Sequence, residues 1–154
     1  MRYLLICITL FTIKNASAQN YDVNAYVFHH SILDAQASIG NEMYEFNKSA
    51  TLLNLKILKF EIKKSIQFLD SLKIYNNETA YYNATRTLFN TYKEIADIDF
   101  PQLLKYVEDP ELGNEDFKAK KNGIFDNVKN KMQLVFPPFE DAQKQFCIKY
   151  KLQQ

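Results

Sequence analysis

Apolar residues recur every three or four positions along four stretches of the chain, which is the spacing of one face of an α-helix. The first stretch predicts one helix over residues 22–48, with Gly40 as its weak point. Its apolar positions are Tyr21, Ala25, Phe28, Ile32, Ala35, Ile39, Met43 and Phe46. The apolar–polar alternation of a β-strand never continues for more than a few residues, so we expect no sheet.

The second stretch, which follows Thr51, is apolar around more of its circumference than a surface helix normally is. Its main stripe is Leu55, Leu58, Ile62, Ile66, Leu69 and Leu72, and a further apolar set is Leu53, Ile57, Phe60, Phe68 and Tyr75. Such a helix is either the most buried of its domain or shared with a partner. The narrow polar side carries Lys56, Lys59, Lys63 and Asp70. We predict a solvated face there, with an anion site as the alternative.

The third and fourth stretches each contain proline. The third predicts a helix over residues 77–108, kinked or briefly interrupted before Pro101. The fourth keeps its helical phase from Phe117 to Tyr150, although Pro137-Pro138 stands in its middle. Because the phase continues past the prolines, we predict two collinear halves with a kink between about Leu134 and Pro138.

Four helices with short connections predict an all-α, up-down-up-down four-helix bundle. The composition agrees, since the 154 residues include 3 Gly and 4 Pro, fewer than the turns of a sandwich or barrel require. The 47% hydrophobic content is that of an ordinary globular domain.

Residues 1–18 have the pattern of a signal peptide. Arg2 precedes an apolar run that is too short to span a bilayer, and Ala16-Ser17-Ala18 forms a small-x-small cleavage site. We therefore predict cleavage after Ala18, a bundle domain over residues 19–154, no transmembrane anchor after cleavage, and a secreted or periplasmic protein. Cys7 follows bulky Ile6, which disfavours lipidation.

Cleavage would remove Arg2 and Lys14 from the 19 basic residues and none of the 18 acidic ones, leaving a net charge of −1. This balance argues against nucleic-acid binding, which usually needs a basic excess on one face. Cys147 would be the remaining cysteine, so no intramolecular disulfide could form. A lone cysteine is typically a small core residue.

The adjacent histidines of Phe28-His29-His30-Ser31-Ile32-Leu33-Asp34 raise the question of a metal or haem site. Relative to the apolar stripe, His29 lies about 75° away and His30 almost opposite, so both cannot face one interior ion. We predict two exposed histidines and no metal, cofactor or catalytic residue. A haem ligated by His29 with Met43 or Met132 is the alternative.

Nucleophilic catalysis by Cys147 would require the first and last helices to be neighbours and His29 to turn inward. Even then, the sequence indicates no third group that would orient the histidine. The carboxylate pairs Asp97/Asp99 and Glu115/Asp116 stand at predicted turns and helix starts, where the helix dipole favours acids.

A second row on the first helix, opposite the core stripe, is the candidate partner surface: Tyr26, His30, Leu33 and Tyr44. Scattered surface aromatics are the alternative explanation. The wide apolar arc of the second helix is the candidate surface for a homo-oligomer.

Two helix-face patterns are Ile32-x-x-x-Gln36-x-x-Ile39-x-x-x-Met43-x-x-Phe46-Asn47 and Phe139-Glu140-Asp141-Ala142-Gln143-Lys144-Gln145-Phe146. Both resemble a family of small secreted or surface helical proteins of Leptospira and Bacteroidetes with no known activity. The resemblance implies an exported helical protein and carries over no catalytic residue. Members often have a lipobox, which this chain lacks.

Together these patterns predict an exported, non-enzymatic helical bundle that binds or scaffolds a protein partner in the periplasm, at the surface or outside the cell. The alternative is a bundle that binds a small ligand, a haem or a metal. An enzyme is the least favoured class.

Overall fold

A computed structural model describes residues 22–109 and 113–152. The predicted signal peptide and its cleavage site lie outside the described residues. Within these ranges the regular elements are all helices, which confirms the all-α prediction.

The first two helices begin at side-chain caps. Helix α1 (Val23–Lys48) follows Asp22, whose carboxylate accepts hydrogen bonds from the N–H groups of Asn24 and Ala25. Helix α2 (Leu52–Ser71) follows Thr51, whose hydroxyl accepts from the Asn54 N–H. Both caps satisfy donors that have no partner inside the helix.

A short 3-10 turn, η1 (Tyr75–Asn77), joins α2 to α3 (Thr79–Glu94). Asn76 and Asn77 have φ angles of 45° and 59°, which asparagine tolerates better than most residues.

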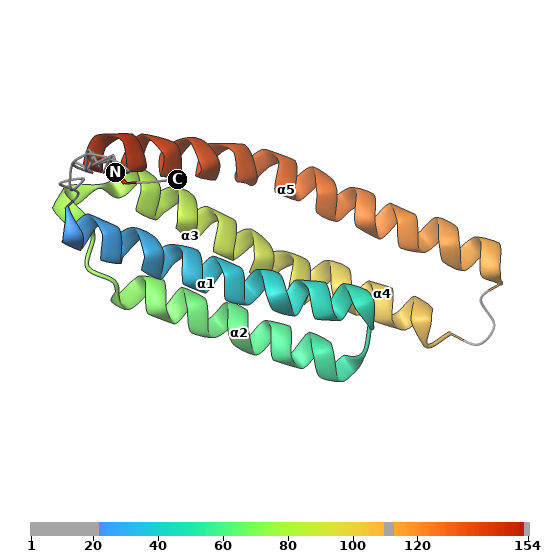
Figure 1. The fold of residues 1–154 in the computed structure, drawn as a ribbon. Coiled ribbons are helices and arrows are strands. Elements are labelled where there is room, and N and C mark those ends of the chain that lie inside the picture. Colours follow the sequence, from blue (N-terminus) through green and yellow to red (C-terminus); the bar gives the residue numbers. More distant parts are fainter. Residues whose placement is uncertain (1–21, 110–112, 153–154) are drawn as a thin grey trace, which may run out of the picture.

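The predicted interruption before Pro101 is a π-helical turn, η2 (Ile95–Asp99), followed by α4 (Phe100–Val107). Pro101 has no N–H to donate, and its ring would clash with the carbonyl four residues back. The wider turn avoids this clash, because the Phe100 N–H donates to the Ile95 carbonyl five residues back. Helix α3, η2 and α4 therefore form one continuous rod (Figure 1).

Helix α5 (Asn114–Tyr150) continues through Pro137 and Pro138, so its two halves belong to one helix, as the phase predicted (Figure 1). The kink between Leu134 and Pro138 stays a prediction. Both prolines are exposed. The carbonyls that lose their donors belong to Gln133 and Leu134, and Leu134 is 77% exposed. Water can therefore hydrate this side of the helix while Phe139 stays in the core.

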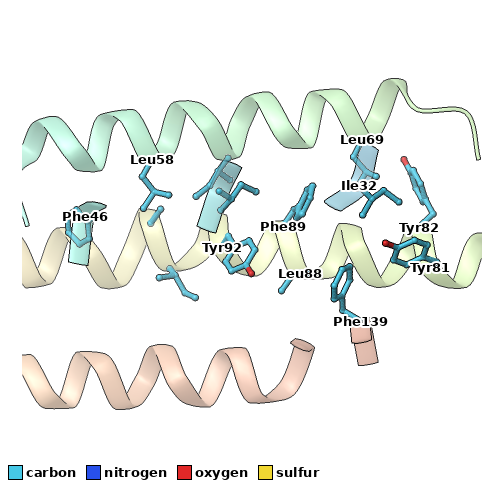
Figure 2. Packing of buried hydrophobic residues seen from close by; sticks show 14 of the residues in the cluster. Ile32, Phe46, Leu58, Leu69, Tyr81, Tyr82, Leu88, Phe89, Tyr92 and Phe139 are labelled. Carbon is cyan, nitrogen blue, oxygen red and sulfur yellow. The ribbon is translucent and has the colours of Figure 1, made fainter. Parts of the chain in front are cut away.

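The rods run antiparallel in chain order, with α2 packed on α1, α3 on α2, and α5 on α3 and α4 (Figure 1). This arrangement confirms the up-down-up-down four-helix bundle. The core between them is built from Ile32, Leu58, Leu69, Leu88, Phe89 and Phe139, among others (Figure 2). At the α4 end, the rings of Phe46 and Phe100 stack with their centroids 4.4 Å apart.

The other end of the bundle is an aromatic cluster centred on Phe146 of α5. Its ring centroid lies 5.5 Å from that of Phe28, 5.2 Å from that of Tyr81 and 4.7 Å from that of Tyr150. Tyr81 also lies beside Phe139, at 5.8 Å (Figure 2). This cluster brings the start of α1 against the end of α5 and surrounds His29.

Candidate functional site

His29 lies inside the bundle with 2% of its surface exposed, so the prediction of an exposed residue is wrong. Its ring contacts those of Tyr81 and Phe146 at centroid distances of 5.8 and 6.2 Å. A residue that lies about 75° from the centre of the apolar stripe is exposed when its helix packs against one neighbour only. Helix α1 packs on α2 with one side and meets Phe146 with the other, which widens its buried arc enough to include His29.

Both ring nitrogens of His29 have partners. The Tyr81 hydroxyl lies 3.0 Å from Nδ1, and the Cys147 Sγ lies 3.5 Å from Nε2. A neutral imidazole donates from one nitrogen and accepts at the other. Either Tyr81 donates to Nδ1 while Nε2–H donates to sulfur, or the thiol donates to Nε2 while Nδ1–H donates to the Tyr81 oxygen. In both tautomers the three side chains form one hydrogen-bonded chain across α1, α3 and α5.

Burial keeps these three groups neutral. Desolvation, reinforced by the nearby charge of His30, lowers the pKa of His29. Desolvation raises the pKa of the Cys147 thiol and, together with Cys147, that of the Tyr81 hydroxyl. A nucleophilic cysteine needs the opposite shifts, which favour a thiolate beside an imidazolium. The hydrogen-bonded chain of Tyr81, His29 and Cys147 is therefore suited to stabilising the core rather than to nucleophilic attack.

The geometry that nucleophilic catalysis by Cys147 would require is nevertheless present. Helices α1 and α5 meet at this end of the bundle, and His29 turns inward and reaches Cys147. The third group, Tyr81, was missed as an orienting residue although its position belongs to the apolar stripe of α3. A tyrosine at a core position signals that its hydroxyl needs a buried partner. That signal pointed to a polar side chain on a neighbouring helix but not to which one.

A haem or metal ligated by His29 would have to displace one of these two hydrogen bonds, since Nδ1 faces Tyr81 and Nε2 faces Cys147. Across residues 22–109 and 113–152, no group of three or more His, Cys, Asp or Glu side chains is arranged to hold a metal ion.

The predicted partner surface on α1 is partly exposed. Tyr26 and Tyr44 are exposed, whereas His30 and Leu33 are half-buried. The rings of Tyr26 and His30 lie 4.0 Å apart, so these two side chains form one aromatic unit. The role of this row in binding stays a prediction.

The second apolar set of α2 faces solvent. Leu53 is 65% exposed, Phe60 67% and Ile57 41%, and Phe68 is also exposed. Leu58, Ile62 and Leu69 on the opposite side are buried. The explanation that the wide apolar arc makes α2 the most buried helix of the domain is therefore wrong. We call Leu53, Ile57, Phe60 and Phe68 the outer stripe of α2.

The carboxylate pair Asp97/Asp99 is split between two environments. Asp99 is buried, accepting from the Asn127 amide at 2.5 Å and the Lys131 ammonium at 2.8 Å, which ties η2 to α5. Asp97 is exposed and pairs with Lys59 and Lys93. Glu115 and Asp116 occupy the first turn of α5, as the dipole argument predicted.

No family model, no curated protein and no solved structure matches this chain. The resemblance to secreted helical proteins of Leptospira and Bacteroidetes therefore stays a prediction. Within the part of the chain that the structure describes, no helix combines the length and apolar character needed to cross a membrane.

Proposed function

We propose that this protein is an exported, non-enzymatic helical bundle that acts by binding protein, and that the outer stripe of α2 is its binding surface. The observation that carries the proposal is the exposure of Leu53, Ile57 and Phe60 on the side of α2 opposite the core. A contiguous exposed apolar strip on a small domain is typical of an interaction site.

The spacing of the strip suits a helix as its partner. Leu53, Ile57 and Phe60 follow one another at intervals of four and three residues, and Lys64 continues the pattern. This is the spacing of the a and d positions of a two-helix seam. The strip from Leu53 to Phe68 is about 22 Å long at the rise of an α-helix.

A second copy of the chain is the partner that the strip fits best. In an antiparallel pair with its twofold axis beside Phe60, Leu53 faces Phe68 of the other copy and Ile57 faces the aliphatic stem of Lys64. A parallel pair would instead place two Lys64 ammonium groups opposite each other, which is unfavourable. In the antiparallel pair, Lys64 can keep its 3.1 Å ion pair with Glu61 at the rim.

The expected dimer is weak. The outer stripe provides less surface than the about 800 Å² per partner of a standard interface, even with neighbouring α2 residues included. We therefore expect a dissociation constant of about a micromolar or above.

Sedimentation velocity of residues 19–154 over a wide concentration range tests this proposal. The wild-type chain should pass from monomer to dimer as its concentration rises, and Phe60→Glu should stay monomeric. Leu134→Glu is the matched control, because Leu134 is a more exposed apolar residue on α5 and should leave dimerisation intact. A monomer up to millimolar concentration, or a dimer that survives Phe60→Glu, would contradict the proposal.

Export rests on Ala16-Ser17-Ala18 behind a short apolar run. Intact-mass measurement of protein from the native host should give a chain that begins at Gln19, recovered from the periplasm or the medium. A species that begins at a lipid-modified Cys7 would refute cleavage after Ala18.

A further inference from the structure

A groove of about 440 Å³ lies between α2 and the rod formed by α3 and η2. Half-buried Ile66 and the methylene stems of the lining lysines provide its accessible apolar surface, above buried Ile62 and Ala96. Its volume lies within the range of about 300–1,000 Å³ that is usual for small-molecule sites. The groove is on a different side of α2 from the outer stripe.

Three lysines line this groove with a single carboxylate. Lys59 and Lys93 approach the two oxygens of Asp97 at 3.0 and 2.7 Å, so both ammonium groups lie at the groove. Lys63 forms no ion pair with any residue that the structure describes. The hydrogen bond from Lys93 outweighs partial burial and lowers the pKa of Asp97, which stays ionised. The lining therefore carries an excess of two positive charges.

The π turn contributes to this groove directly. Ala96 and Asp97 belong to η2, whose wide turn forms because Pro101 cannot continue the α-helical hydrogen bonding. Buried Ala96 lies at the base of the groove, and Asp97 pairs with Lys59 and Lys93, for which an anionic head group would compete. Single π turns within helices frequently accompany binding sites.

A second groove, between α1 and α2, lacks this arrangement. It is smaller, about 310 Å³, and its charged residues are Asp34, Glu61 and Lys64. Three serines make up much of the remaining lining. Its mixed charge favours no ligand of one sign.

We propose that the α2–α3 groove binds a single-chain amphiphile with an anionic head group. The alkyl chain lies on Ile66 and on the methylene stems of the lysines, and the carboxylate or phosphate head is held by Lys63 together with Lys59 and Lys93. Lys59 and Lys63, which the sequence placed on a solvated face, thus belong to an anion site whose ligand also has an apolar part.

Isothermal titration of residues 19–154 with dodecanoate, below its micelle concentration, tests this proposal. Dodecyl phosphate has the same alkyl chain and tests whether the site prefers a phosphate or a carboxylate head group. Dodecyl maltoside has the alkyl chain with an uncharged head group. Acetate and inorganic phosphate have the anionic group without the alkyl chain. We expect one site per chain for an anionic amphiphile, with the uncharged or tailless probes at least about tenfold weaker. Equal binding of dodecanoate and dodecyl maltoside, or no binding of either anionic amphiphile, would overturn the proposal.

Matched variants locate the site. Lys63→Gln should weaken dodecanoate binding about three- to fivefold, as for one partly exposed charge, whereas Lys56→Gln on the same helix should have no effect. Ile66→Ser should weaken binding about tenfold, and Leu134→Ser should not. Circular dichroism verifies that each variant keeps its helicity.

Asp97→Asn gives a readout that misfolding cannot imitate, because it should strengthen dodecanoate binding by removing the repelling carboxylate. Weaker binding by Asp97→Asn, or equal losses for Lys63→Gln and Lys56→Gln, would overturn the proposal. Phe60→Glu should leave this binding unchanged, so the groove and the outer stripe of α2 can fail independently.

Discussion

His29 and His30 are neighbours in sequence but differ completely in surroundings. His29 is enclosed by Tyr81, Cys147 and Phe146, whereas His30 is half-buried against the ring of Tyr26. Two buried polar groups depend on the imidazole of His29 for their hydrogen bonds. At the scale of single residues, the stability of the aromatic end therefore depends on one histidine of the pair.

His29→Ala should destabilise the protein by about 2–4 kcal/mol, because it leaves a cavity and removes the partner of the Tyr81 hydroxyl. His30→Ala should change the free energy of unfolding by no more than about 0.5 kcal/mol, as usual for surface positions. Urea denaturation followed by circular dichroism measures both. Equal, small effects would mean that the hydrogen-bonded chain contributes nothing to stability.

The lowered pKa of His29 predicts a loss of stability in mild acid. Its unfolded-state pKa is about 6.5 and its folded-state pKa is lower, so the unfolded chain binds the proton more readily. The contribution of neutral His29 to the free energy of unfolding is fully present above pH about 6.5, and it is lost as the pH falls toward the folded-state pKa of His29.

The free energy of unfolding should therefore decline between about pH 6.5 and 5, before most carboxylates titrate. His29→Gln cannot titrate and should have a flatter profile in this window, and His30→Gln serves as the control. A profile that is identical in wild type and His29→Gln would assign the acid sensitivity to other groups.

At the scale of elements, proline shapes two of the rods in different ways. Pro101 coincides with a π turn that presents Ala96 and Asp97 to the α2–α3 groove. Pro137 and Pro138 lie in α5 without ending it, because the carbonyls they leave unpaired are on its solvated side. Buried Asp99 then secures the π turn to α5 through Asn127 and Lys131.

Replacing both Pro137 and Pro138 by Ala should be neutral or stabilising, since it restores two backbone donors to a helix that already continues through the site. Phe139→Ala should cost about 3–5 kcal/mol, as for a fully buried ring. Phe60→Ala on the outer stripe should cost far less in the monomer. Thermal and urea unfolding of the three variants would contradict this account if Phe139→Ala cost less than about 1 kcal/mol.

At the scale of the whole molecule, one apolar core joins both ends of the bundle. The contacts run from Phe46 and Phe100 at one end to Phe28, Tyr81 and Phe146 at the other. Cys147 is buried and free of any disulfide in the described residues, so stability depends on this packing.

A single continuous core predicts two-state unfolding. Far-ultraviolet circular dichroism, which reports the helices, and near-ultraviolet circular dichroism, which reports the packing of the tyrosines along the bundle, should give the same urea midpoint. Reducing agent should leave that midpoint unchanged. An earlier transition for the tyrosine signal would mean that side-chain packing is lost before the helices unfold.

The helix spans, the interruption before Pro101 and the continuity of α5 were predictable from the sequence, because each depends on local periodicity and on the backbone chemistry of proline. The exposure of the outer stripe of α2 was left as one of two alternatives. Periodicity reports which residues are apolar and does not report how many neighbours a helix has.

The tertiary structure decided the environment of His29 for the same reason. A residue at the edge of an apolar stripe is exposed or buried according to whether a second helix packs against that edge. Only the close approach of Phe146 and Cys147, more than a hundred positions further along the chain, turned His29 into a core residue. Likewise, the cationic groove needs Lys93 and Asp97 of one rod beside Lys59 and Lys63 of another, a juxtaposition that local sequence patterns cannot encode.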